Sequence, residues 1–113
     1  MAAQLVDLHL HSTFSDGRYT PTMLVDEAVA KGIGVIAVTD HDSWNGIAEA
    51  REAAKRYDGR IRVLTGVELG TQYENDAVHI LGYHVSMDCE ALHKKMDEMR
   101  HAREHRLYAM LEK

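Results

Sequence analysis

The seven residues Leu5–His11 have the sequence LVDLHLH, in which apolar and polar side chains alternate. Because successive side chains of a β-strand point to opposite faces, this alternation predicts a strand with one polar and one apolar face. Two imidazoles and a carboxylate on one strand face can bind a divalent metal ion. The alternative is an amphipathic strand with a solvated face, for which histidine is an unusual choice. The polar face would carry Asp7, His9 and His11, and the apolar face Val6, Leu8 and Leu10.

Three further apolar runs lie beside residues that can bind metal. The run Ile33–Val38 is almost wholly apolar, which is typical of a strand buried on both faces of a parallel sheet. In such sheets functional groups gather at the carboxyl ends of strands, although the last run carries a histidine near its start. The runs are Ile33–Val38 before Asp40, His41 and Asp42; Arg62–Val67, which is expected to end at Glu68; and Val78–Val85, which contains His79 and His84.

Helix signals separate these runs and predict an α/β fold with the order β-α-β-α-β-β-α. A first helix is expected to begin at Thr20-Pro21, where a capping residue precedes proline, and to stop at Gly32. A second helix is expected to begin at Ser43. The polar stretch Gly70–Asp76 predicts a loop that lies over the site. The buried side chains of these two helices are expected to be Leu24, Val25, Ala28, Val29, Ile47, Ala50 and Ala54.

A third helix is expected from Asp88 and has no stop signal before the chain ends. Its apolar residues recur at helical spacing, which favours a packing surface over a cofactor site. Three arginines on another side form either a solvated basic face or a phosphate contact. Two histidines four residues apart could bind a metal, but two solvated side chains are the simpler interpretation. These sets are Leu92, Met96, Met99, Leu107 and Met110; Arg100, Arg103 and Arg106; and His101 and His105.

Composition indicates one globular domain at most. The 113 residues carry 13 basic and 18 acidic side chains, a net charge of −5, which argues against a surface that coats nucleic acid. A nucleic-acid end stays possible as a substrate, because bound metal ions would reverse the local field. Cys89 is the single cysteine, so a reducing, cytoplasmic location is expected. We expect no signal peptide and no membrane contact.

Five motifs occur in order between residues 5 and 85, and together they resemble the PHP family, named for its polymerase and histidinol phosphatase domains. They are Asp7-x-His9-x-His11, Ser15-Asp16-Gly17, Thr39-Asp40-His41-Asp42, Gly66-Val67-Glu68 and His79-Ile80-Leu81-Gly82-Tyr83. The stretch Thr39–Gly46 is most similar to stand-alone bacterial phosphoesterases that act on nucleotides or RNA ends. The resemblance implies the N-terminal portion of a distorted (βα)7 barrel, with a cluster of metal ions at its strand ends.

The resemblance also implies roles for individual residues. His9 and His11 would hold one metal ion, Glu68 would bridge it to a second ion held by His79, and Asp16 and His41 would hold a third. Asp16, His41 and Glu68 would be the catalytic set. The ions would be two or three in number and could be Mn, Zn or Fe. Possible supporting residues are Asp7, Asp40 and Asp42, and Arg18 is a possible substrate contact.

Family members continue to a further histidine and a late Asp-x-His pair, whereas this chain ends at Lys113. The expectation is therefore the front part of a catalytic domain in residues 1–87, and a helix leading into further sequence in residues 88–113. The favoured activity is hydrolysis of phosphate esters of nucleotides or RNA ends by a metal-activated hydroxide. The alternatives are a histidinol-phosphate phosphatase and a catalytically incomplete metal-binding or interaction fragment. An uncovered sheet edge and the final helix predict self-association.

Overall fold

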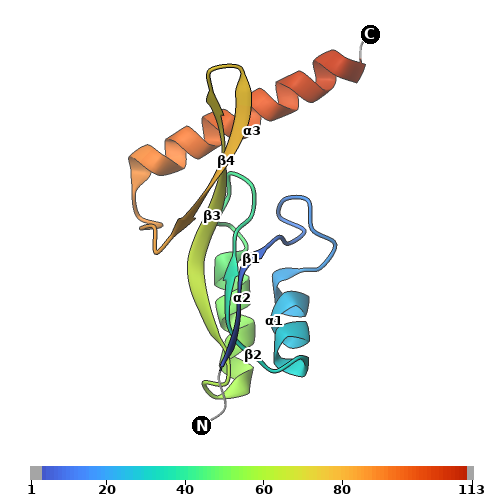
Figure 1. Cartoon of the computed structure of the whole chain (residues 1–113), viewed down its shortest axis with the longest axis vertical. Coiled ribbons are helices and arrows are strands. Elements are labelled where there is room, and N and C mark those ends of the chain that lie inside the picture. Colours follow the sequence, from blue (N-terminus) through green and yellow to red (C-terminus); the bar gives the residue numbers. More distant parts are fainter. Residues whose placement is uncertain (1–3, 112–113) are drawn as a thin grey trace.

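The computed structural model describes residues 4–111, which form a mixed α/β fold with the predicted order of elements (Figure 1). A short 3-10 helix, η1, extends α2 and is an addition to that order. The elements are β1 (Leu5–Leu10), α1 (Pro21–Ala30), β2 (Ile33–Val38), α2 (Ile47–Ala54), η1 (Lys55–Tyr57), β3 (Arg62–Tyr73), β4 (Asp76–Tyr83) and α3 (Glu90–Leu111).

The four strands form one sheet in the order β1-β2-β3-β4. The first three strands are parallel, and β4 runs antiparallel to β3. Figure 1 shows that the β3–β4 hairpin extends beyond the rest of the sheet and that α3 crosses it, at the end of the molecule opposite the N-terminus. The hairpin and α3 therefore lie at the end of the sheet where β1 and β2 finish.

The loop predicted for Gly70–Asp76 is wrong, because β3 continues to Tyr73 and β4 begins at Asp76. Only Glu74 and Asn75 connect the strands, and Glu74 has the positive φ of 56° that a tight turn often requires. The polar residues Thr71 and Gln72 are typical of a turn, which is why the sequence predicted a loop. Polar residues are also accepted in a strand such as this end of β3, where the side chains are not buried. As a result Glu68 lies inside β3 rather than at its end, and His84 lies just beyond β4.

The first helix begins where the sequence predicts. The Thr20 hydroxyl accepts a hydrogen bond from the Met23 amide at 3.1 Å, and Gly32 follows the helix with a φ of 77°. The second helix begins at Ile47 instead of Ser43. The Ser43 hydroxyl accepts from the Asn45 amide within a turn, so its capping chemistry is used before the helix starts.

Both short helices cover the same face of the sheet. Their buried side chains pack with those of β2 and β3, and Ala53 is buried where Ala54 had been expected. Leu10 is the one residue of the predicted apolar face of β1 that joins this core, because β1 is an edge strand with irregular register; Val6 and Leu8 are exposed. The core consists of Leu24, Val25, Ala28, Ile36, Val38, Ala50, Ala53, Ile61 and Val63.

The third helix begins at Glu90, two residues later than expected, and is attached through a second apolar cluster. Met96 is fully buried against Trp44, Ile47 and Val67. The predicted apolar stripe is buried only in this half of the helix, since Leu107 and Met110 are 55% and 68% exposed. No helix within residues 4–111 is long and apolar enough to span a lipid bilayer.

We expect Met96→Ala to destabilise the chain by about 2–5 kcal/mol, the usual cost of emptying a buried methionine site. The matched change Met110→Ala should have an effect below about 0.5 kcal/mol, since that side chain is exposed. Urea unfolding followed by Trp44 fluorescence measures both, because Trp44 lies in the same cluster as Met96. Equal effects of the two substitutions would mean that α3 is not anchored through Met96.

Candidate metal centre

The Glu68 carboxylate lies at the centre of a polar cluster on the sheet face opposite α1 and α2. Glu68 is 4% exposed and forms an isolated parallel bridge with His41, which follows β2. Two backbone hydrogen bonds of 3.0 Å secure this bridge, one from the Glu68 amide to the Asp40 carbonyl and one from the Asp42 amide to the Glu68 carbonyl. The segment after β2 thus pairs directly with the middle of β3.

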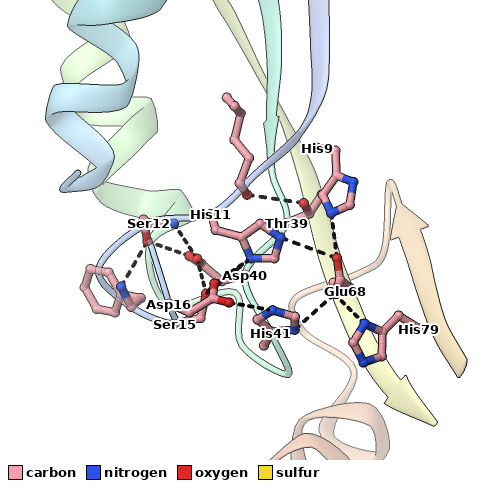
Figure 2. A network of polar contacts seen from close by, with 12 residues as sticks. His9, His11, Ser12, Ser15, Asp16, Thr39, Asp40, His41, Glu68 and His79 are labelled. Carbon is pink, nitrogen blue, oxygen red and sulfur yellow. Dashed lines mark hydrogen bonds and ion pairs between the residues drawn. The ribbon is translucent and has the colours of Figure 1, made fainter. Parts of the chain in front are cut away.

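Four imidazoles surround this carboxylate, as Figure 2 shows. His9 and His11 come from β1 and the residue after it, and their Nε2 atoms lie 2.6 and 3.4 Å from Glu68 Oε1. His41 and His79 present their Nδ1 atoms to Oε2 at 3.1 and 3.0 Å. Because β4 pairs Gly70 with His79, the hairpin brings the last imidazole to the same face of the sheet as Glu68.

A second carboxylate, Asp16, joins two of these imidazoles from the other side. Its Oδ1 lies 3.2 Å from His11 Nδ1, and its Oδ2 lies 3.2 Å from His41 Nε2. The loop that carries Asp16 folds back on β1, and the Gly17 amide donates to the Ser12 carbonyl at 2.9 Å. A Cβ on Gly17 would lie 2.1 Å from the His11 carbonyl oxygen, so the loop requires glycine there.

Both carboxylates are held in their ionised form. Burial, the largest single influence on each, would raise the pKa of Glu68 and of Asp16. The hydrogen bond from His9 and the charges of His41 and His11 outweigh it at Glu68, so that pKa lies below its ordinary value. The charges of His41 and His11 do the same for the pKa of Asp16. Ionised carboxylates are the form that a metal ion binds.

Asp40 is 1% exposed and organises the loop rather than an imidazole. Its carboxylate accepts hydrogen bonds from the Ser12 amide and hydroxyl, both at 2.6 Å, and from the Ser15 hydroxyl at 2.7 Å (Figure 2). Asp7 accepts from the His9 backbone amide at 3.2 Å. Each of these aspartates therefore supports backbone that carries a candidate ligand.

Asp42 connects the centre to α3. It is 1% exposed, adopts a φ of 49°, and accepts from the Gly70 amide at 3.0 Å and from Arg103 at 2.8 Å. Its carbonyl accepts from Arg100 at 2.6 Å. The spacing of the arginines indicated that they share a face of α3, but it could not predict their contact with Asp42. That contact depends on where the hairpin places the helix. Arg18 is exposed in the loop before α1.

Three groups of side chains could each hold a metal ion, with ligand atoms within 4.8 Å of one another. They are His9, His11 and Glu68; His11, Asp16 and His41; and His41, Glu68 and His79. Among residues 4–111 no such group includes His93, His101 or His105. Together the three groups contain the six residues expected as ligands, but His11 also belongs to the second group and His41 also belongs to the third.

Several of the candidate ligand atoms are spaced as they would be around a metal ion. His41 Nδ1 is buried and lacks a hydrogen-bond partner among residues 4–111, although Glu68 Oε2 is 3.1 Å away, because the two are not aligned for a hydrogen bond. Two ligand atoms bound to one ion at about 2.0–2.2 Å lie about 3.0–3.5 Å apart. Most of the imidazole–carboxylate separations here fall in or near that range.

Comparison with known proteins agrees with this geometry. The profile of the PHP domain matches residues 7–112. The chain belongs to the PHP family. The matched residues include the strands and the loops that carry the cluster, and the match extends through α3 to the end of the described residues.

Two curated relatives and one solved structure show the level of similarity. The chain is 39% identical over 115 residues to the 5′-3′ exoribonuclease Rnm of Escherichia coli and 40% identical over 98 residues to the 3′,5′-nucleoside bisphosphate phosphatase of Chromobacterium violaceum. A Bifidobacterium adolescentis structure assigned to the metal-dependent phosphoesterases superposes with a TM-score of 0.86 at 34% identity. The alignments cover 98%, 87% and 94% of this chain but 39%, 34% and 36% of those proteins.

Proposed function

We propose that this chain forms the metal-binding part of a metal-dependent phosphoesterase that hydrolyses phosphate esters of nucleotides or RNA ends. The observation that carries the proposal is the Glu68 carboxylate surrounded by four imidazoles, one of which has a buried nitrogen without a hydrogen-bond partner among residues 4–111. The names of the exoribonuclease and bisphosphate phosphatase relatives support the nucleotide class. We also propose a cytoplasmic location. The proposal further divides the chain into a catalytic part, residues 1–87, and a helix that leads into further sequence, residues 88–113.

Each candidate ligand has a distinct role in this proposal. His9 and His11 would hold one ion, Glu68 would be shared with a second ion held by His79, and Asp16 and His41 would hold a third. Divalent ions such as Mn, Zn or Fe would supply a water of lowered pKa and positive charge beside the phosphate. His11, His41 and Glu68 each belong to two of the three ligand groups, so these side chains would also control the spacing of the cluster.

The space for a substrate lies directly over these ligands. A cavity of about 640 Å³ is lined by Asp16, His41 and His79 and, from α3, by Arg100, Arg103 and Glu104. Arginine matches the charge and geometry of phosphate oxygens better than any other side chain. A phosphate in this cavity would therefore share it with candidate metal ligands and with two guanidinium groups.

A hydrolysis screen separates the three candidate functions. With manganese present, the purified chain should release phosphate slowly from adenosine 3′,5′-bisphosphate and not from histidinol phosphate. The slow rate is expected because the chain spans less than two fifths of its relatives. Release from histidinol phosphate alone would favour the histidinol-phosphate phosphatase, and metal binding without hydrolysis of either would favour the interaction fragment.

The matched variants His9→Ala and His101→Ala make this screen specific to the centre. His9 contacts Glu68, whereas His101 is exposed on α3. His9→Ala should lower metal occupancy and abolish the residual hydrolysis with an unchanged circular dichroism spectrum, and His101→Ala should behave as wild type. A His9→Ala protein that unfolds but retains its metal would reverse the role given to this residue.

Self-association is also part of the proposal. Apolar side chains are exposed on both edge strands, with Leu5 and Val6 of β1 at 58% and 55% and Ile80 of β4 at 51%. The end of α3 adds Leu107 and Met110, and open strand edges with apolar faces favour pairing with another chain. Light scattering should give a mass above 12.7 kDa per particle that rises with concentration. A constant mass equal to one chain would contradict this part.

A further inference from the structure

A groove runs between the β3–β4 hairpin and α3, next to the candidate metal centre. Its volume is about 460 Å³, and its walls include Gly70, Ala77 and His79 of the hairpin and Arg103 and Arg106 of the helix. In Figure 1 the helix crosses the hairpin in this region. His79 and Arg103 also line the cavity over the metal centre, so the two spaces adjoin at these side chains.

Small residues on one face of the hairpin leave this space open. Side chains of a strand alternate, so Gly70 and Gln72 lie on the same face as Glu68. Their partners across the hairpin are His79 and Ala77. A Cβ at position 70 would make a tight contact of 3.3 Å with an Arg103 Nη atom and an ordinary contact of 3.6 Å with Asp42 Oδ2. The groove is therefore an extension of the face that carries the candidate ligands.

The charge of the groove is opposite to that of the whole chain. The chain has a net charge of −5, but the groove is lined by two arginines and one aspartate, Asp42. Asp42 is paired with Arg103 at 2.8 Å and also accepts from the Gly70 amide. Arg106 is exposed and has no ion pair with any side chain of residues 4–111. Its guanidinium is free to bind an anion.

From this arrangement we infer that the groove binds a second phosphate of the substrate, one that is not held at the metal centre, and that Arg106 is its main contact. This inference rests on the proposed function and specifies its substrate as a nucleotide with two phosphate groups, either a nucleoside bisphosphate or an RNA end. Gln72 and Asn75, which line the same groove, offer amide groups to the connecting ribose or base. Arg106 thereby becomes a specificity residue rather than part of a solvated basic face.

Binding of three ligands to the manganese-loaded chain tests the inference by calorimetry. The ligands are inorganic phosphate, adenosine 3′,5′-bisphosphate and the 5′-phosphorylated dinucleotide pApA. Arg106→Gln should weaken binding of the bisphosphate or the dinucleotide by about five- to tenfold, as expected for loss of one charge-assisted contact in a solvated groove. Binding of inorganic phosphate should change by less than about twofold. The ligand that loses affinity identifies which of the two sources of the second phosphate the groove accepts.

The matched control is Arg60→Gln, which removes the same charge from an exposed position between η1 and β3. It should leave all three affinities within about twofold, and Arg106→Lys should retain part of the effect on the two nucleotides. If Arg106→Gln binds all three ligands as wild type does, the groove inference is wrong and the proposed function stands. If the wild-type chain binds manganese but no inorganic phosphate, the proposed function fails and the inference fails with it.

Discussion

Glu68→Gln should lower the affinity of the chain for divalent metal by at least about tenfold and remove more than one ion. The reason is that Glu68 belongs to two of the three candidate ligand groups and contacts four imidazoles. Glutamine keeps the size of the side chain but loses its charge, and its amide nitrogen cannot act as a ligand at neutral pH. Competition against a chromophoric zinc chelator measures the affinity.

The matched control for this change is Glu52→Gln in α2. Glu52 is exposed, and its one ion pair among the described residues is with Lys55 at 3.0 Å, so its replacement should leave metal affinity unchanged. Circular dichroism should show both variants folded. A Glu68→Gln protein with wild-type stoichiometry and affinity would show that the carboxylate is a structural acceptor for histidines and not a metal ligand.

Asp40→Ala should destabilise the metal-free chain by about 3 kcal/mol. Three hydrogen bonds of 2.6–2.7 Å converge on this buried carboxylate, and its loss would leave the Ser12 amide and hydroxyl without their acceptor. The same loop carries Asp16, so metal affinity should also fall. Urea unfolding in excess chelator measures the stability alone, since no bound metal then contributes.

The exposed carboxylate Asp76, at the start of β4, provides the control for this second prediction. Asp76→Ala should change stability by less than about 0.5 kcal/mol. If Asp40→Ala and Asp76→Ala had equal effects, the hydrogen bonds to Asp40 would not organise the loop, and the position of Asp16 would need another explanation.

The parts of the site that could be predicted lie on short segments with strong local patterns. The alternation around His9 places two imidazoles on one side of a strand whatever the tertiary fold. The apolar run before Asp40 and His41 likewise indicates a buried parallel strand. Those features depend on neighbouring residues in the chain, so the sequence alone is enough to find them.

The parts that were missed depend on contacts between distant segments. The polar composition of Thr71 and Gln72 favoured a loop, but pairing along the hairpin keeps them in β3. Glu68 consequently lies within a long strand. The pairing of Asp42 with Arg103 connects residues 61 positions apart, and the exposure of Val6 follows from the place of β1 at the sheet edge. No local pattern encodes these relationships.

Metal content per chain, measured by elemental analysis on protein purified without chelator, tests the central claim most directly. We expect about two or three equivalents of Mn, Zn or Fe, in keeping with the three ligand groups around Glu68 and Asp16. Removal by chelator should be reversible, with the same stoichiometry after reloading. Protein that contains less than about 0.1 equivalent, and that takes up neither manganese nor zinc when either is supplied, would contradict it.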